Sequence, residues 1–218
     1  MQARRLFLWA GVAAPLLCYG AFLAASLAYP EMRHAKQYVS ELGGPQAAHP
    51  FIFNLGVGLG GAAGVLAGRG FFLALRALGG GLFPAGLTAI LAAVGGGAII
   101  VSGLFPWPDP RHQWVNLGLA IQFAPLAVVW GLSKRRDFLG LKLFLVGSFV
   151  LMGVIGAITR HVVLPDLCDW DNVGWWERSY AFVLMAWIGV AAWAFDRRLA
   201  RGEPDGGSAA EPAALPAE

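Results

Sequence analysis

The stretch ALGGGLFPAGLTAILAAVGGGAIIVSGLFPWP, residues 77–108, runs for 32 residues without a single Asp, Glu, Lys, Arg or His. A helix that spans a bilayer needs about 20 consecutive apolar residues, with a range of about 17–25. Glycine and proline crowd both ends of the stretch, so we place its helix at 82–104. Five more windows lack these residue types, at 6–30, 50–68, 113–133, 143–159 and 179–195. The sequence therefore predicts six membrane-spanning helices.

The overall composition agrees with a membrane protein. Of the 218 residues, 57% are hydrophobic and only 13% are charged, whereas soluble proteins average about 25% charged residues. The net charge of +3 is too small for a protein that binds nucleic acid through phosphate contacts. The two cysteines lie far apart in the sequence, which excludes both a disulfide framework and a CxxC metal or redox pair.

The predicted fold is an all-α integral membrane protein, a six-helix transmembrane bundle that occupies residues 1–201. We expect its helices at about 6–29, 50–68, 82–104, 113–133, 139–159 and 177–196. After Gly202 the composition changes to Gly, Pro, Ala, Ser and acidic residues. Such a segment buries too little apolar surface to fold, so residues 202–218 are predicted to be a disordered cytoplasmic tail.

The Lys and Arg residues predict the orientation of the bundle, because cytoplasmic loops carry an excess of them. Eleven of the 16 would lie on the side of the termini: Arg4, Arg5, Arg69, Arg76, Lys134, Arg135, Arg136, Lys142, Arg197, Arg198 and Arg201. The other five are Arg33, Lys36, Arg111, Arg160 and Arg178. Both termini are therefore expected in the cytoplasm, and the protein is expected to be a multi-pass protein of the cell membrane.

Most other ionisable residues fall on the opposite, non-cytoplasmic side. They are His34, His49, His112 and His161, with Glu31, Glu41, Asp109, Asp166, Asp169, Asp171 and Glu177. On the cytoplasmic side, apart from the tail, the acids are Asp137 and Asp196, each beside arginines that can neutralise it. Ionisable groups at the membrane boundary are costly unless they are paired or hydrated. We therefore expect any functional site to face outward.

Asp109 and His112 follow the motif Gly103-Leu104-Phe105-Pro106. Asp109 precedes Pro110, which is the pattern of a helix N-cap with proline at the first helical position, and we favour capping as its role. His112 lies at the rim of the fourth helix, where an imidazole can bind a metal or transfer protons. Ser40 and Glu41 lie before a helix-ending Gly43-Gly44-Pro45, and His49 follows. Glu41, His49 and His112 are candidate metal ligands or catalytic acid/base groups.

Two further motifs concern helix packing. Asn54 is a polar residue within the second apolar window, where a single interhelical hydrogen bond accounts for it. Gly56, Gly60, Gly64 and Gly68 recur at every fourth position, a spacing that allows close approach of two helices. We favour a seam inside the monomer over a dimer interface. Arg178 lies at the start of the sixth helix, where a positive charge is unfavourable. It therefore requires a partner, and we expect Glu41 or Asp109 in that role.

Taken together, Ser40-Glu41-Leu42-Gly43, Phe53-Asn54, Gly103-Leu104-Phe105-Pro106 with Asp109 and His112, and Gly174 with Glu177-Arg178 resemble a known family. It is the multi-pass bacterial and archaeal membrane family catalogued as domain of unknown function 998. The resemblance covers about residues 6–198. It implies a six-helix bundle and draws attention to the same outward-facing residues, but it brings no established activity.

Two hypotheses for function remain. The first is a membrane protein that binds or handles a lipid or small ligand at its non-cytoplasmic mouth, with Ser40, Glu41, Asn54, Asp109, His112, Glu177 and Arg178 as ligand-binding candidates. The second is a membrane-embedded hydrolase or transferase that acts on a lipid headgroup, with His112, His49 and Glu41 as metal ligands or acid/base groups. The lipid bilayer is the one partner that the sequence implies; cofactor, ligand and oligomeric state stay open.

A topology reporter tests the orientation. Fused after Arg201, alkaline phosphatase should be inactive and green fluorescent protein fluorescent, because the excess of Lys and Arg keeps this end in the cytoplasm. Fusions in the loop from Arg160 to Arg178 should give the reverse pattern. Phosphatase activity after Arg201 would reverse the orientation and move every histidine to the cytoplasmic side.

Overall fold

The computed structural model describes residues 2–202, and every regular element in that range is a helix. Six segments are long and apolar enough to cross a membrane, which confirms the all-α, six-span prediction. The elements are α1 (Gln2–Leu27), η1 (Val39–Gly43), α2 (Pro50–Ala77), α3 (Leu82–Leu104), η2 (Pro110–Phe123), α4 (Ala124–Gly131), η3 (Arg136–Phe138), α5 (Leu139–Thr159) and α6 (Val173–Gly202), with η denoting a 3-10 helix. Of the predicted tail, only Gly202 lies within the described residues, as the last residue of α6.

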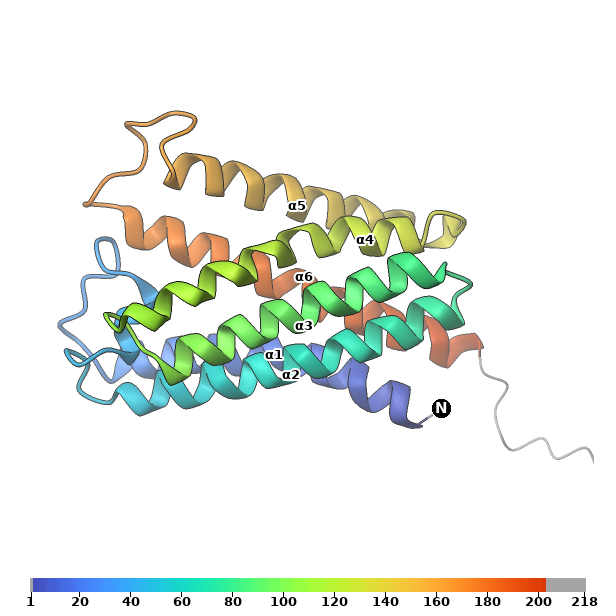
Figure 1. Ribbon diagram of the computed structural model, residues 1–218, viewed down its shortest axis with the longest axis horizontal. Coiled ribbons are helices and arrows are strands. Elements are labelled where there is room, and N and C mark those ends of the chain that lie inside the picture. Colours follow the sequence, from blue (N-terminus) through green and yellow to red (C-terminus); the bar gives the residue numbers. More distant parts are fainter. Residues whose placement is uncertain (1, 203–218) are drawn as a thin grey trace, which may run out of the picture.

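The spans run side by side, and both ends of the described chain lie at the same end of the bundle (Figure 1). The opposite end carries the segments 28–49, 105–109 and 160–172, and we call it the outer end. The helix α2 reaches Ala77, beyond the predicted limit of residue 68. Arg69 lies over the ring of Phe7 and Arg76 donates to the carbonyl of Gly80 at 2.8 Å. Long basic side chains of this kind can extend along apolar surface while their charge is satisfied, so they do not end the helix.

The glycine-rich face of α2 forms its seams within the monomer. A Cβ atom at Gly60 would overlap Cys18 of α1, and one at Gly61 would lie 2.6 Å from the carbonyl oxygen of Gly96 in α3. At Gly68 the neighbour is again α3, with the carbonyl oxygen of Ala89 at 2.7 Å. Small residues allow this close backbone approach, so the predicted intramolecular seam is confirmed, divided between α1 and α3.

The aromatic core lies toward the end of the bundle that carries the termini. The Phe71 ring stacks on Trp187 at 5.9 Å and meets Phe195 edge to face at 6.0 Å. At the same end Asp137 accepts hydrogen bonds from Arg135 and Arg198, and Asp196 pairs with Arg5 at 3.3 Å. These contacts confirm that arginines neutralise both acids, and they join α1 and η3 to α6 at this end.

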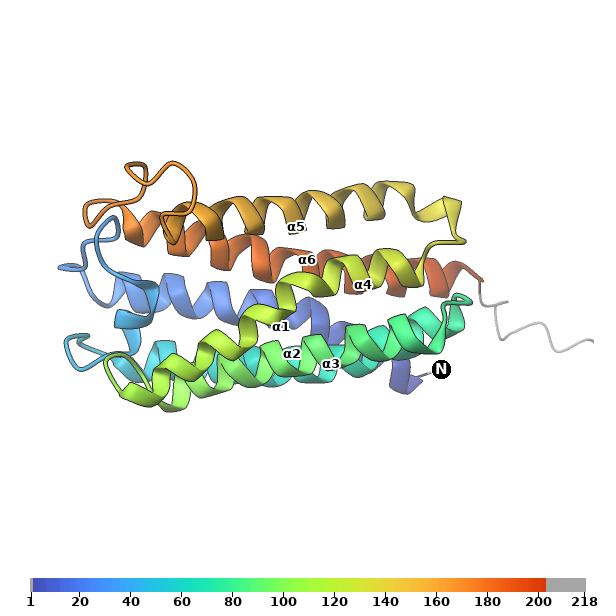
Figure 2. The same ribbon diagram turned by 45° about the horizontal axis from the view of Figure 1, so that its top comes forward.

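The fourth span differs from the predicted helix at 113–133. It begins as a 14-residue 3-10 helix, η2, and becomes α-helical only at Ala124. Such long 3-10 segments are uncommon, and their three residues per turn place positions i and i+3 directly in line. The span starts beside α3 at the outer end and leans toward α5 and α6 (Figure 2).

Because of this threefold repeat, η2 has three distinct edges. The first edge faces the bundle interior and consists of His112, Val115, Gly118 and Ile121. The second edge faces α5 and α6 and consists of Gln113, Asn116, Leu119 and Gln122. The third edge faces outward and consists of Trp114, Leu117, Ala120 and Phe123. Trp114, Leu117 and Phe123 are 57%, 70% and 50% exposed, as expected for side chains in contact with lipid. The η2 helix thus has one edge toward the bundle interior and a second, mostly polar edge toward α5 and α6.

Candidate functional site

The segment 28–49 folds back onto the outer end of α6 at Gly174. The amide of Gly174 donates to the carbonyl of Ala35 at 2.6 Å. A Cβ atom at this position would lie 2.8 Å from that carbonyl oxygen and would overlap the carbonyl oxygens of His34 and Gln37. Glycine at 174 therefore lets the loop backbone lie directly against α6.

Arg178, one turn further along α6, binds the same turn of the loop. Its Nη1 atom lies 2.8 Å from the carbonyl oxygens of both His34 and Gln37, and 2.9 Å from that of Gly174. The sequence-based expectation that Arg178 pairs with Glu41 or Asp109 is wrong. The guanidinium has several donors in a fixed plane, which suits a group of converging carbonyls, and both carboxylates have other partners.

The short helix η1, residues 39–43, closes the outer end of the bundle, and we call it the plug. A carboxylate oxygen of Glu177 in α6 accepts the amide N–H of Val39, and Asn54 of α2 donates to the carbonyl of Gly43 at 3.0 Å. Glu41 accepts from the Tyr38 amide at 2.8 Å and from the Gln37 side chain at 2.9 Å. Asn54 thus bonds to the plug rather than to another spanning helix, and its Oδ1 atom is buried without a partner among the described residues.

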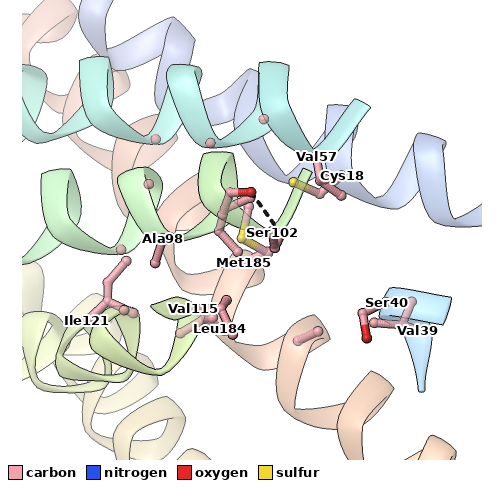
Figure 3. A pocket seen from close by; sticks show the side chains of 18 of the residues that line it. Cys18, Val39, Ser40, Val57, Ala98, Ser102, Val115, Ile121, Leu184 and Met185 are labelled. Atoms are coloured by element: carbon pink, nitrogen blue, oxygen red, sulfur yellow. Dashed lines mark hydrogen bonds between the residues drawn. The ribbon is translucent and has the colours of Figure 1, made fainter. Parts of the chain in front are cut away.

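Beneath the plug lies a cavity of about 270 Å³ among α1, α2, α3, η2 and α6, which we call the inner cavity. Figure 3 shows Val39 and Ser40 of the plug at one end and Ala98 and Ile121 at the other. Most of the wall is apolar and includes Cys18, Phe22, Val57, Leu184, Met185 and Ile188. Ligand sites are mainly apolar with a few polar groups that fix orientation, and this cavity has that character.

Ser40, His112 and Glu177 supply the polar end of the inner cavity. His112 is buried, and its Nδ1 atom lies 2.8 Å from the carbonyl oxygen of Phe105. Because a carbonyl only accepts hydrogen bonds, Nδ1 carries the proton. The other ring nitrogen, Nε2, has no hydrogen-bond partner among the described residues. Ser40 comes from the plug, His112 from η2 and Glu177 from α6.

A second space of about 410 Å³, the outer crevice, lies between η2, α5 and α6. Its wall shares Ser40, His112 and Glu177 with the inner cavity and adds polar side chains, among them Tyr38, Gln113 and Arg160. Burial and the nearby Glu177 carboxylate raise the pKa of Tyr38, so its phenol stays protonated at neutral pH. The polar end of the inner cavity therefore also borders a crevice at the outer end.

Asp109 has the capping role that the sequence predicts. Its carboxylate accepts the Arg111 amide at 2.8 Å and the Arg111 guanidinium at 2.7 Å, and Pro110 follows as the first residue of η2. These bonds lower the pKa of Asp109 to about 2, so the group is a carboxylate at neutral pH. Asp109 belongs to the wall of neither the inner cavity nor the outer crevice.

The candidate trio Glu41, His49 and His112 does not come together. His49 is exposed at the start of α2, against the ring of Phe51, and Glu41 is bound to its own loop. Within residues 2–202, no group of three or more His, Cys, Asp and Glu side chains is arranged to hold a metal ion. His112 is the member of the trio that faces the inner cavity.

Comparison with known families gives one match. The model of a family described as "Protein of unknown function (DUF998)" matches residues 12–194. The chain belongs to the DUF998 family. No curated protein and no solved structure matches it.

The DUF998 resemblance motifs meet at the plug. Ser40-Glu41-Leu42-Gly43 forms the plug itself, Asn54 binds it from α2, and Glu177 binds it from α6. His112 contributes to the cavity beneath it. Four separate segments of the chain thus build one structural unit.

Sequence reasoning missed several residues of the site. Asn116 and Tyr180 line both spaces, and Ser102 lines the inner cavity. The signal for Asn116 was a threefold repeat, since Gln113, Asn116 and Gln122 are polar while Trp114, Leu117 and Phe123 are apolar. Read with the 3.6-residue period of an α-helix, these positions scatter over the whole surface.

The fit of Gly174 against the loop predicts a loss of stability in Gly174→Ala. The added methyl group would overlap backbone carbonyl oxygens, and overpacking typically costs about 1–3 kcal/mol. For a chain of this size the melting temperature should fall by about 2–10 °C, measured by tryptophan fluorescence in detergent. Gly153→Ala is the control, because a Cβ atom there meets open space. Equal shifts in the two variants would contradict the anchoring role of Gly174.

Proposed function

We propose that this multi-pass membrane protein binds a lipid or another small amphipathic molecule at its non-cytoplasmic mouth. The apolar part of the ligand would occupy the inner cavity, and its polar part would lie at Ser40, His112 and Glu177. The observation that carries the proposal is an apolar cavity inside the bundle whose wall includes Ser40 of the plug, Glu177, which binds the plug, and His112. We also propose the cell membrane as its location, in the orientation that the Lys and Arg residues predict.

The volumes fit a ligand of modest size. Binding sites for small molecules have volumes of about 300–1,000 Å³, and the inner cavity of about 270 Å³ lies just below that range. The outer crevice shares seven wall residues with it, namely Ser40, His112, Val115, Asn116, Leu119, Glu177 and Tyr180. A single hydrocarbon chain in the cavity, with a polar group that reaches the crevice, would use both spaces.

The other candidate residues have supporting roles in this proposal. Asn54, Glu41 and Arg178 hold the plug and its loop in position, and Asp109 caps η2, which carries His112. They would affect binding through the shape of the mouth rather than through contact with the ligand.

A hydrolase or transferase acting on a lipid headgroup is the second candidate. One observation favours an acid/base version of it: His112, fixed through Nδ1, and Ser40 line the same polar end of the cavity. The metal-dependent version lacks a set of ligands within residues 2–202. Chemical conversion of the bound molecule, rather than its recovery unchanged, would favour the enzyme.

A variant that fills the cavity tests ligand binding. Val115 lines the inner cavity, so the larger ring in Val115→Phe should displace part of the ligand. A steric cost of about 1.4 kcal/mol lowers affinity about tenfold. The measurement is native mass spectrometry of the protein released from mild detergent, followed by extraction and identification of the bound molecule.

Leu117→Phe is the matched control. Leu117 lies on the same helix but is 70% exposed on the lipid-facing edge. The fraction of Leu117→Phe that carries bound ligand should therefore equal that of the wild type. Equal loss in both variants, or a wild-type protein without any bound amphiphile, would contradict the proposal.

A further inference from the structure

The wall of the inner cavity contains an acidic side chain but no lysine or arginine. It includes the carboxylate of Glu177 and the imidazole of His112. The remaining polar side chains in the wall are neutral: Ser40, Ser102, Asn116 and Tyr180. A buried carboxylate is costly unless an opposite charge or several hydrogen bonds compensate it, so a positively charged donor beside Glu177 would stabilise its ionised form.

The nearest arginines do not change this balance. Arg178 directs its guanidinium to the loop carbonyls of His34 and Gln37. Arg160 lines the outer crevice but not the inner cavity, and its Nη1 atom lies 3.1 Å from the carbonyl oxygen of Gly156. Neither arginine lines the inner cavity, so a phosphate or carboxylate inside it would lie near Glu177 without a lysine or arginine in the same wall.

The hydrogen-bond donors of the polar end are largely used within the protein. The Ser102 hydroxyl donates to the carbonyl of Ile99 at 2.8 Å, the Tyr180 hydroxyl to Gln122 at 3.4 Å, and the Asn116 amide to Gln113 at 3.1 Å. The Nδ1–H group of His112 donates to the carbonyl of Phe105. For Ser102, Tyr180 and His112 the protein itself satisfies the donor, whereas the Ser40 hydroxyl has no acceptor within the described residues.

The acceptors, in contrast, remain available. Glu177 uses one oxygen, Oε2, for the Val39 amide, and within the described residues Oε1 has no hydrogen-bond partner. The same holds for Nε2 of His112. Both side chains line the same two spaces. A ligand that donates hydrogen bonds would give both atoms a partner.

We propose that the natural ligand is an amphiphile whose polar end carries an ammonium group, bound by Glu177 and His112, with a hydrocarbon chain in the inner cavity. This inference rests on the proposed function and specifies its ligand class. An ammonium group supplies three donors and a positive charge, which complements the free acceptors and the carboxylate. Hydrogen bonds between charged groups are about twice as strong as those between neutral groups, so a hydroxyl should bind more weakly.

Four amphiphiles with the same hydrocarbon chain test this ligand class. Dodecylamine, dodecanol, dodecanoate and dodecyl phosphate are titrated into the full-length protein in neutral maltoside micelles, with empty micelles as the blank. Tryptophan fluorescence or calorimetry reports binding. We expect the amine to bind tightest, about tenfold or more above either anion, with the alcohol between them.

Glu177→Gln tests whether Glu177 is responsible for the preference for an ammonium group. The amide keeps an oxygen that can accept the Val39 N–H but loses the charge, so the affinity for dodecylamine should fall about tenfold. The affinity for dodecanol should stay within about twofold, since a neutral hydroxyl gains little from the charge. Unchanged dodecanol binding also shows that the variant is folded. Glu31→Gln makes the same change at an exposed carboxylate and should leave both affinities unchanged.

The outcomes separate the ligand class from the proposed function. If dodecanoate or dodecyl phosphate binds as tightly as dodecylamine, the ammonium assignment is overturned while amphiphile binding stands. If Glu177→Gln weakens dodecanol and dodecylamine equally, Glu177 acts by holding the plug and the assignment also fails. If none of the four binds above the micelle blank, and Val115→Phe has the same bound lipid as the wild type, the proposed function itself fails.

Discussion

The hydrogen bonds from α6 to the 28–49 loop are the interaction on which the outer end depends. Backbone groups near a bilayer need partners inside the protein, because lipid offers none. The loop carbonyls of His34 and Gln37 find theirs in Arg178, and the Val39 amide finds its partner in Glu177. Gly174 allows the close approach that both contacts require. With these bonds in place, the 28–49 loop lies over the outer end of the bundle, and its short helix, the plug, borders the cavity.

Glu177 and Arg178 are neighbours in the sequence, but their side chains contact different parts of the protein. Arg178 faces the loop, where carbonyl dipoles satisfy its charge. Glu177 faces the plug and the inner cavity, where its Oε1 atom has no hydrogen-bond partner within residues 2–202. An ion pair between the two would neutralise both charges. Their different orientations place an acidic side chain in the wall of an apolar cavity, and this is the chemical basis of the ligand class that we propose.

The η2 helix determines the shape of the site. Its three residues per turn place His112, Val115, Gly118 and Ile121 along one edge, toward α3 and the cavity. Close packing of Gly118 against Ala98 and of Ile121 against Gly95 fixes that edge, while the polar edge borders the outer crevice. An α-helix would rotate these residues apart by its 3.6-residue period. The local geometry of one span therefore creates both spaces.

Much of the fold could be predicted from the sequence, because uncharged windows of bilayer length have few other interpretations. The six spans, the family, the Asp109 cap and the glycine seam all followed from local patterns. The plug, the partners of Arg178 and the cavity could not be predicted, because they depend on contacts between segments more than 100 residues apart, such as Val39 with Glu177. The 3-10 geometry of η2 was missed because its threefold repeat was read with an α-helical period.

The central claim is that the inner cavity holds an amphiphile with its polar end at Glu177. An electron cryomicroscopy map of the protein in native-lipid nanodiscs tests this most directly. The account predicts elongated density between α2, α3, η2 and α6 that ends beside Glu177 and His112. A map in which side chains from α3 and η2 close the cavity, or in which only isolated water density occupies it, would contradict the claim.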